Sequence, residues 1–565
     1  MSFKDYKYQR VELCPIDKEI SELPLLISRA SSAAEALELY GKYESFRNRL
    51  YTMFCLAYIR YSVNTNDELY AKENDYYNKN MPKHDELANK VNQALASLPF
   101  RKELEKELGD IFFINASLKA KAFSPDIMED LAIESDLQTK YQKLMASARI
   151  DFDGKILAFS QLTPYKESPD REMRKAAFFA EGGFLAQNCH ELDDIFDKLV
   201  KVRTRIAKKL GYDNFIPVAY ARRMRNCYDA KDVAAFRKQV VETIVPVNNK
   251  LIKKQHERNG IDCPTAYDRT LIFKSGNAVP KDSPEVIFQK GAEMYHAMGE
   301  KTGQFFDFML HEDLFDVLIR PGKVNGGYCE MLPDFRAPFV FANFNGTSGD
   351  IEVLTHECGH ALEGYLSARK YKHFEQRNIT MDVAEIHSMS MEFLTYPYMK
   401  EFFYDQTDKF IYAHLAEALK FLPYGCMVDH FQEMVYTNPD MTPLERRKAW
   451  LELESVYRPD MDWADIPHYN SGGWWQRQLH IYMDPFYYID YCLAQAVSLM
   501  FWDLARKDRS AAWDKYMLIL SKSGTLTFND LLKSADLPSP FEAGTLDGLA
   551  KAALEHLDSI DTSNF

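Results

Sequence analysis

The chain lacks the features that mark a secreted, membrane-spanning or disulfide-stapled protein. Its nine cysteines are scattered, odd in number and without a C-x-x-C pair, which indicates reduced thiols rather than a disulfide framework. No run of about 18 apolar residues is present, so we expect no transmembrane helix. The N-terminal stretch has neither the apolar core nor the cleavage site of a signal peptide. We therefore expect a soluble, cytoplasmic protein.

Positive charge is in short supply as well. The 69 Lys and Arg residues are outnumbered by 83 Asp and Glu residues, and the formal net charge is −14. This acidic balance argues against nucleic acid and against an anionic membrane as the main partner. The turn Gly326-Gly327-Tyr328 lacks a Gly-Lys-Ser/Thr pattern, so we interpret it as structural or cleft-lining and not as a phosphate loop.

Glycine and proline are scarce, at 24 each among 565 residues, while 46% of the chain is hydrophobic. Such a composition is typical of a compact, largely helical protein. In the first two hundred residues, apolar side chains recur every three or four positions, which predicts long amphipathic helices. Ser32 and Glu35, three residues apart, predict a capped helix start. The predicted fold is therefore mainly α.

No fixed repeat, low-complexity stretch or Gly/Ser-rich linker divides the chain. Residues 1–200 show helical periodicity without recognisable chemistry, so we expect them to form an N-terminal helical domain that acts as a wall. The sequence motifs with chemical meaning lie in residues 201–565, which we expect to form the catalytic domain. The sequence marks no sharp boundary between the two.

The helical pattern is interrupted between residues 318 and 350. Paired glycines, prolines and an alternating apolar stretch predict a small sheet there. Residues 338–346 are typical of a short strand, and the leading Pro338 favours a sheet edge. An exposed edge can bind an extended peptide through its main chain, which gives four candidates for substrate binding, Phe341, Ala342, Asn343 and Gly346. The alternative is a packed hairpin that only supports the fold.

The clearest chemistry lies in the H-E-x-x-H sequence from His356 to His360. Residues four apart share one face of a helix, so both imidazoles can reach a single ion. Glu357 projects to the side, where it can contact water on that ion. Apolar residues at helical spacing from Ile351 to Tyr365 predict a helix that contains the motif. This arrangement suits zinc-assisted peptide hydrolysis; the alternative is a solvated helix with two incidental histidines.

A third ligand distinguishes between classes of zinc peptidase. A thermolysin-like site needs an acid about twenty residues after the second histidine, where this chain has Thr380. A metzincin needs Gly and His at the positions of Glu363 and Leu366. Neither class fits. Instead, a second helix-like segment contains Glu385, 25 residues after His360.

This spacing, together with the segment from Met381 to Glu392, resembles the thimet oligopeptidase / oligoendopeptidase F family of zinc metallopeptidases. The resemblance covers most of the chain and is firmest over residues 320–500. It is closest to the bacterial oligoendopeptidase F branch. The resemblance implies one Zn²⁺ ion per chain, held by three ligands, His356, His360 and Glu385.

The resemblance also implies roles for residues near the ligands. Glu357 is expected to be the general base. Glu392 lies seven residues after Glu385 and so on the same helical face, where it is expected to orient a ligand histidine. An exposed acid is the alternative for Glu392. His387 points elsewhere on an ideal helix, and we expect a bystander or a group behind the ligands.

A second cluster is the aromatic segment HIYMDPFYYIDY. Asp484 and Pro485 are typical of an N-cap and first helical residue, which places Tyr488 and Tyr491 on one face. An aromatic stripe of this kind is usually core. The resemblance implies instead that His480 and both tyrosines face the metal, with the phenols donating to the developing oxyanion.

The resemblance implies a large helical ellipsoid with a deep central channel and a small β-sheet beside the H-E-x-x-H helix. Such a channel admits short unstructured peptides. The expected function is a zinc-dependent oligoendopeptidase that cleaves internal bonds by Glu357-assisted attack of zinc-bound water. Two alternatives remain: an exopeptidase on the same scaffold, releasing dipeptides or acting as a carboxypeptidase, and a non-catalytic peptide-binding protein. The intact ligand set counts against the second.

Overall fold

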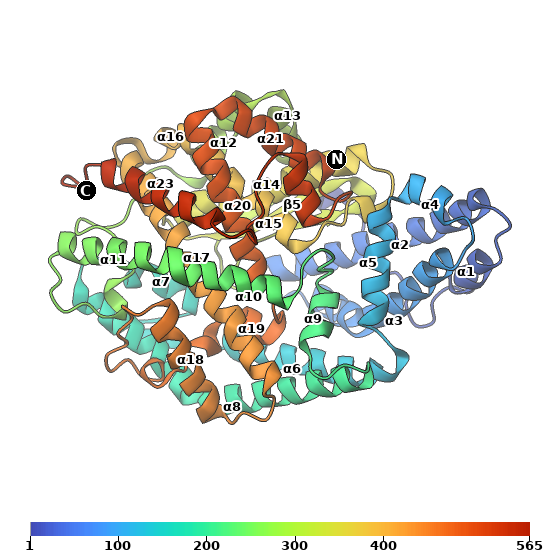
Figure 1. The fold of residues 1–565 in the computed structure, drawn as a ribbon, viewed down its shortest axis with the longest axis horizontal. Coiled ribbons are helices and arrows are strands. Elements are labelled where there is room, and N and C mark those ends of the chain that lie inside the picture. Colours follow the sequence, from blue (N-terminus) through green and yellow to red (C-terminus); the bar gives the residue numbers. More distant parts are fainter. Residues whose placement is uncertain (1) are drawn as a thin grey trace.

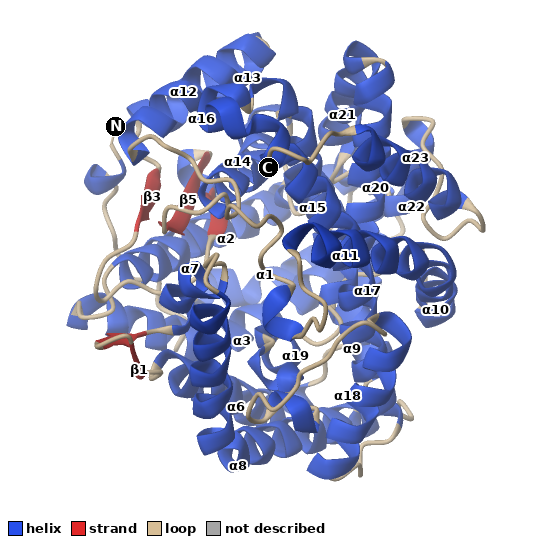
Figure 2. Cartoon of the chain, turned by 90° about the vertical axis from the view of Figure 1, so that its left-hand side faces the viewer, coloured by secondary structure: helices blue, strands red, loops and turns tan. Residues whose placement is uncertain are grey.

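Helices dominate the computed structural model, which describes residues 2–565 (Figures 1 and 2). Within these residues, only two small sheets accompany the helices, so the predicted mainly α fold is confirmed. In the described part of the chain, no helix combines the length and apolar character needed to cross a membrane. All nine cysteines are free thiols.

The first half of the chain forms a series of helices interrupted by one small hairpin. The helices are α1 Lys18–Ser28, α2 Ala33–Val63, α3 Glu68–Ala96, α4 Arg101–Leu108, α5 Asp110–Lys121, α6 Met128–Ala146, α7 Thr163–Lys166, α8 Arg171–Lys209, α9 Ile216–Arg222, α10 Ala230–Gln239 and α11 Val245–Asn259. The antiparallel hairpin consists of β1 Ile150–Phe152 and β2 Lys155–Leu157. Helices α1 to α5 gather at one end of the molecule (Figure 1).

The second half contains the larger sheet and a further set of helices. The strands are β3 Phe315–Leu318, β4 Tyr328–Leu332 and β5 Ala337–Phe344. The helices are α12 Pro284–Met298, α13 Glu300–His311, α14 Gly349–Lys370, α15 Met381–Leu394, α16 Lys400–Phe403, α17 Thr407–Thr437, α18 Pro443–Tyr457, α19 Leu479–Met483, α20 Tyr488–Lys507, α21 Arg509–Lys522, α22 Phe528–Ser534 and α23 Thr545–Ser559.

The start of α2 follows the sequence prediction. The hydroxyl of Ser32 accepts a hydrogen bond from the main-chain N–H of Glu35 at 3.2 Å. The Glu35 carboxylate turns back and accepts from the N–H of Ser31 at 2.7 Å. These bonds satisfy N–H groups that a helix start otherwise leaves unpaired.

Helix α8 passes through the predicted domain boundary at residue 200. One hydrophobic core includes Phe196 and Ile206, on either side of that position, and extends to Leu557 in α23. The division into residues 1–200 and 201–565 therefore does not coincide with a break in secondary structure, and it stays a prediction.

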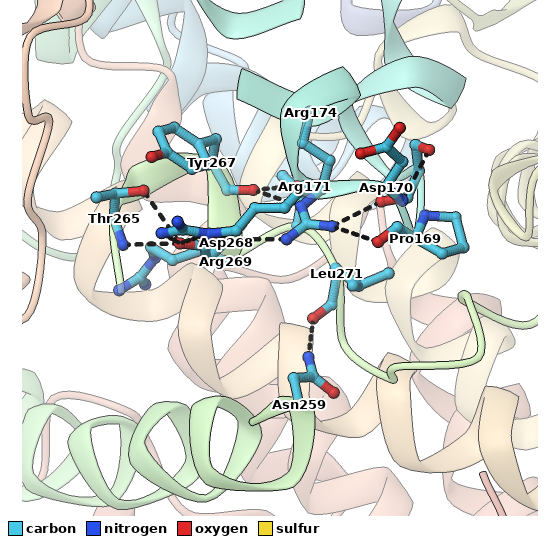
Figure 3. Close-up of polar contacts among 12 residues, drawn as sticks. Pro169, Asp170, Arg171, Arg174, Asn259, Thr265, Tyr267, Asp268, Arg269 and Leu271 are labelled. Atoms are coloured by element: carbon cyan, nitrogen blue, oxygen red, sulfur yellow. Dashed lines mark hydrogen bonds and ion pairs between the residues drawn. The ribbon is translucent and has the colours of Figure 1, made fainter. Parts of the chain in front are cut away.

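A buried carboxylate anchors the first turn of α8 to the segment that follows α11 (Figure 3). Asp268 is fully buried, and it accepts hydrogen bonds from Arg171 and Arg174, each at 2.8 Å. The main-chain N–H of Thr265 donates to the same carboxylate at 3.0 Å. Burial opposes the charge on Asp268, but these donors hold its pKa below the ordinary value. The pairing fixes α8 relative to the loop before α12.

The larger sheet has the strand order β3-β5-β4, with β5 in the centre. Phe341 of β5 pairs with Asp316 of the parallel strand β3 and with Tyr328 of the antiparallel strand β4. The prediction that residues 338–346 form a sheet edge is therefore wrong. Pro338 lies in β5 opposite Met331 of β4. The edge strands are β3 and β4.

The connection from β5 to α14 is short and tightly bonded. The carboxylate of Asp350, in the first turn of α14, accepts hydrogen bonds from the N–H groups of Asn345 and Gly346, both at 2.8 Å. Gly346 has a φ of 83°, a conformation that glycine adopts without strain. The sheet thereby sets the position and direction of α14, the helix that carries the H-E-x-x-H sequence.

Candidate metal centre

Two packed helices bring the predicted ligands together. His356 and His360 lie on α14, and Glu385 lies on α15. Gly359 makes the close packing possible, because a Cβ atom at this position would lie 2.5 Å from the main-chain oxygen of His387 and 2.7 Å from the Cα of Ser388. A side chain there would push α15 away from the two histidines.

The donor atoms of the three residues converge on a single point. Nε2 of His356 lies 3.3 Å and Nε2 of His360 lies 3.4 Å from Oε2 of Glu385. The ligand atoms all lie within 4.8 Å of one another, and no other such group of three appears among residues 2–565. The imidazoles keep 23% and 19% of their surface exposed, so the point of convergence is open to small molecules.

This donor set fits a divalent metal ion. Two imidazole nitrogens and one carboxylate oxygen are the protein ligands of a catalytic zinc site, which leaves a fourth position for water or substrate. Nδ1 of His356 lies 2.7 Å from Oε1 of Glu392, so its Nε2 is the nitrogen left for an ion. Glu392 thus contacts the ligand histidine that its spacing predicts.

The electrostatics suit a cation. Glu385 is 2% exposed, and burial opposes its charge. The charges and hydrogen bonds of His360 and His356 nevertheless hold the pKa of Glu385 well below its ordinary value. Glu357 has no such direct partner, and burial raises its pKa although both histidines act in the opposite direction. A carboxyl group with a raised pKa is better matched to accepting and returning a proton near neutral pH.

Two residues that the sequence did not suggest extend the polar contacts of Glu392 away from His356. Oε2 of Glu392 lies 2.6 Å from Nε2 of His414, on α17. Nδ1 of His414 in turn lies 2.7 Å from the hydroxyl of Tyr396, between α15 and α16. Neither residue belongs to a recognisable motif. Their contacts depend on the packing of both α15 and α17 against α20, which local sequence does not reveal.

The aromatic segment forms a cluster around His480. The ring centroids of Tyr488 and Tyr491 lie 5.0 and 5.7 Å from that of His480. A third tyrosine, Tyr487, was not among the predicted residues, and its hydroxyl donates to Oε1 of Glu385 at 2.7 Å. The segment therefore reaches the ligand set directly.

The start of α20 differs from the prediction. Asp484 is the C-cap of α19, and α20 begins at Tyr488 with Tyr487 as its N-cap residue. Phe486 has a φ of 63°, so the chain turns sharply after Pro485 and does not begin a helix there. This turn, absent from the predicted helix, brings Tyr487 to the ligand carboxylate.

Tyr491 and Tyr488 have different surroundings. Burial raises the pKa of Tyr491 well above its ordinary value, and the negative charges of Glu385 and Glu357 add to the effect, so its hydroxyl stays protonated near the site. Tyr488 packs against the rings of Phe421 and Tyr424, with centroids 5.7 and 5.6 Å away.

His387 lies away from the point of convergence, as its helical position predicts. It is fully buried, and its Nε2 lies 2.7 Å from the hydroxyl of Ser523 on the segment after α21. Burial lowers the pKa of His387 to about 3, with a further contribution from the charge of His360. A neutral imidazole in this position packs α15 against α21.

The four residues predicted to bind substrate lie on or just after β5. Phe341 and Ala342 are buried at 0% and 1% exposure. Because β5 is hydrogen-bonded to a strand on each side, it has no free edge for a peptide. The amide of Asn343 donates to the main-chain oxygens of Val324 and Gly326, both at 2.8 Å. These residues support the neighbouring loop, and the prediction that this strand offers its edge to substrate is corrected.

Comparisons with known proteins give consistent matches along the chain. Residues 164–551 match the model of peptidase family M3, and residues 3–123 match that of the peptidase M3 N-terminal domain. A structure of PZ peptidase A with an inhibitor is similar over 100% of both chains, at 42% identity and a TM-score of 0.97. A protein from Bacillus anthracis assigned as an oligoendopeptidase F is 41% identical over 100% of this chain and 99% of that chain, with a TM-score of 0.92.

Among curated proteins, oligoendopeptidase F of Lactococcus lactis subsp. cremoris is 24% identical over 331 residues, which are 54% of this chain. The match spans about half of that relative's length, at 52%.

Proposed function

Because the chain belongs to peptidase family M3 and is therefore a metallopeptidase, we propose that it is a zinc-dependent oligoendopeptidase. Its substrates are short unstructured peptides, which it cleaves at internal bonds. The observation that carries the proposal is the convergence of the donor atoms of His356, His360 and Glu385, with Glu357 on the same helix as the two histidines. The relatives named oligoendopeptidase F support the endopeptidase assignment.

In this proposal, one zinc ion is held by Nε2 of His356, Nε2 of His360 and a carboxylate oxygen of Glu385. When bound, zinc supplies a Lewis acid that polarises the scissile carbonyl and acidifies water. Glu392 holds the imidazole of His356 in the tautomer whose Nε2 is free to bind.

Glu357 is the general base. It is 7% exposed, and the rise in its pKa through burial makes its carboxylate a stronger base than in water. Glu357 takes a proton from the water that attacks the scissile carbonyl. The same carboxyl group then delivers this proton to the leaving amine.

The aromatic cluster stabilises the negative charge that develops on the carbonyl oxygen. We assign the donating phenol to Tyr491, because the charges of both Glu385 and Glu357 raise the pKa of its hydroxyl. The rings of Tyr488 and His480 lie beside that of Tyr491. A buried, protonated phenol is a preorganised donor, and the loss of one such donor typically lowers the rate by about a hundredfold or more. Tyr487 has another role, since its hydroxyl is already bonded to Glu385.

Substrate main chain pairs with β4 rather than with β5. Strand β4 is an edge strand, and Tyr328 to Met331 are all partly exposed. Gly327, immediately before β4, lies against Glu357, since a Cβ atom there would be 3.4 Å from Oε1 of Glu357. A peptide added along β4 would therefore pass the general base, and main-chain pairing tolerates many sequences.

The N-terminal helices form one wall of the substrate channel in this proposal. Arg47 of α2 donates to Oε2 of Glu375, between α14 and α15, at 2.8 Å, and Tyr40 donates to the same oxygen at 2.6 Å. Cys55 of α2 lies 3.8 Å from Glu330 of β4. Helix α2 therefore contacts β4, which precedes α14 in the sequence, and the segment that follows α14. These contacts support the placement of the N-terminal helices beside α14.

The test uses a peptide of about ten residues with an acetylated N-terminus and an amidated C-terminus. Zinc-loaded protein is expected to cleave it at internal bonds, and mass spectrometry identifies the products. Cleavage only of the matched peptide with free termini would replace the proposal with an exopeptidase. No cleavage of either peptide by protein with one zinc per chain would favour a non-catalytic peptide-binding protein.

A further inference from the structure

A chain of four polar side chains runs from the metal centre into the protein interior. Nδ1 of His356 lies 2.7 Å from Oε1 of Glu392, and Oε2 of Glu392 lies 2.6 Å from Nε2 of His414. Nδ1 of His414 lies 2.7 Å from the Tyr396 hydroxyl. The four residues come from α14, α15, α17 and the turn before α16, so the chain joins elements that are distant in sequence.

Hydrogen-bond chemistry fixes the direction of the two central contacts. An ionised carboxylate only accepts hydrogen bonds. Both imidazoles must therefore present N–H groups to Glu392, Nδ1–H from His356 and Nε2–H from His414. The lone pair of neutral His356 then lies on Nε2, the atom that faces Glu385 and His360.

His414 is well placed to hold Glu392 in this orientation. It is 9% exposed, and its ring packs against Phe393 and Phe410, with centroids 5.0 and 5.6 Å away. The Tyr396 hydroxyl occupies its other nitrogen. The ring therefore has little freedom to rotate, and a fixed N–H group at Oε2 of Glu392 limits rotation of that carboxylate.

We infer that His414 is a positioning residue of the metal centre: its Nε2–H fixes the Glu392 carboxylate, which in turn fixes the Nε2 of His356 for the ion. The Tyr396 hydroxyl, bonded to Nδ1 of His414, in turn fixes the orientation of the His414 ring. The inference deepens the proposed function, because it rests on His356 as a metal ligand. It predicts that metal affinity depends on a side chain that contacts neither the ion nor a ligand.

Zinc affinity, measured by competition with a chromogenic chelator, tests the inference without reference to activity. His414→Leu is expected to weaken zinc binding by about tenfold, the lower end of the range for groups that hydrogen-bond a metal ligand directly, because His414 acts through Glu392. His414→Gln places an amide N–H near the position of Nε2 and is expected to recover affinity to within a few-fold of wild type. Tyr396→Phe is expected to weaken binding less than His414→Leu.

The chain offers a matched control on the same helix. His430 of α17 is also paired with a tyrosine, and its Nδ1 lies 3.1 Å from the hydroxyl of Tyr457, whereas the histidines bonded to Glu392 are His356 and His414. His430→Leu is expected to leave zinc affinity unchanged. Thermal unfolding of the metal-free proteins shows whether each variant folds, and if His414→Leu does not, Tyr396→Phe and His414→Gln are compared with wild type instead.

The outcomes separate this inference from the proposed function. Equal zinc affinity for wild type, His414→Leu and Tyr396→Phe would overturn the positioning role, while wild-type zinc binding and cleavage would leave the proposed function intact. Equal losses in the Leu and Gln variants would also overturn it, because they would indicate packing rather than a hydrogen bond. Wild-type protein that binds no zinc would contradict the proposed function itself.

Discussion

The hydroxyl of Tyr487 donates a hydrogen bond to Oε1 of Glu385 at 2.7 Å, although the two residues are 102 positions apart in sequence. Oε2 of the same carboxylate faces His356 and His360 and also accepts from the hydroxyl of Ser388 at 2.9 Å. Both oxygens of Glu385 therefore have fixed partners. The aromatic segment therefore contacts the candidate metal ligand Glu385 directly.

Tyr487→Phe tests this relationship. Removal of the hydroxyl leaves Oε1 of Glu385 without its donor, so the carboxylate is held less firmly and zinc affinity is expected to fall by about tenfold. Chelator competition provides the measurement. Tyr488→Phe, which changes the adjacent phenol, serves as the control and is expected to retain wild-type affinity. Unchanged affinity in Tyr487→Phe would show that this hydrogen bond does not support the metal centre.

Tyr491→Phe tests the assignment of the oxyanion donor. We expect kcat to fall by about a hundredfold while zinc content stays at the wild-type level, because the phenol acts on the carbonyl oxygen and not on the ligands. Tyr488→Phe is expected to have a smaller effect, since its ring packs against Phe421 and Tyr424. A larger loss of kcat in Tyr488→Phe than in Tyr491→Phe would reverse the assignment.

Acid sensitivity is expected from the pair formed by Glu375 and Arg47. Burial alone would raise the pKa of Glu375, but the charge and hydrogen bonds of Arg47 lower it to about 2, from an ordinary value of 4.5. The unfolded chain therefore binds a proton at higher pH than the folded protein. The stability that Glu375 contributes is present above about pH 4.5 and is lost as the pH falls toward 2.

Glu375→Gln is expected to destabilise metal-free protein by about 1.5–3 kcal/mol at pH 7, because buried Arg47 loses its hydrogen bonds to a charged group and keeps only Glu44, 3.4 Å away, as a carboxylate partner. The difference from wild type should narrow as the pH is lowered from 5 toward 2, because Glu375 of the unfolded chain takes up a proton below about pH 4.5 while the folded protein keeps this carboxylate ionised down to about pH 2. Thermal unfolding midpoints measured across this range check the prediction. Glu68→Gln is the control, since the Glu68 side chain is 89% exposed, and a constant difference for Glu375→Gln would contradict the account.

The sequence was most informative where short-range geometry decides the structure. The spacing of His356 and His360 is sufficient to place both on one face of a helix, and the family resemblance added Glu385 and Glu392. The structure brings all four side chains together. Each of these predictions depends on one helix or on a known spacing between two helices.

The sequence was least informative where distant contacts determine the backbone. Asp484 and Pro485 resemble a helix start, but the N–H of Phe486 donates to Gln432 at 3.0 Å and its carbonyl accepts from Arg225. These partners hold Phe486 at a φ of 63°, which delays α20 to Tyr488. Because Gln432 and Arg225 are distant in sequence from Phe486, the local pattern could not predict this turn. The position of Tyr487 next to Glu385 was therefore not predicted.

The position of β5 was missed for a related reason. Pro338 favours an edge strand when only the strand itself is considered. Strand β3, from the segment after α13, pairs with β5 on the side opposite β4. From the sequence, an exposed edge on β5 was expected. Strand order depends on such tertiary pairing, so sequence alone identified the strand but not its place in the sheet.

The central claim is that Glu357 is the general base of a zinc-dependent oligoendopeptidase, and Glu357→Gln tests it most directly. Glu363→Gln is the matched control, because Glu363 lies on the same helix and burial raises its pKa to about 8, which keeps it mostly protonated at pH 7. Metal content and cleavage of a doubly blocked peptide are measured together. We predict one zinc per chain in both variants and a loss of about a thousandfold in kcat for Glu357→Gln alone. Undiminished cleavage by zinc-loaded Glu357→Gln would contradict the account.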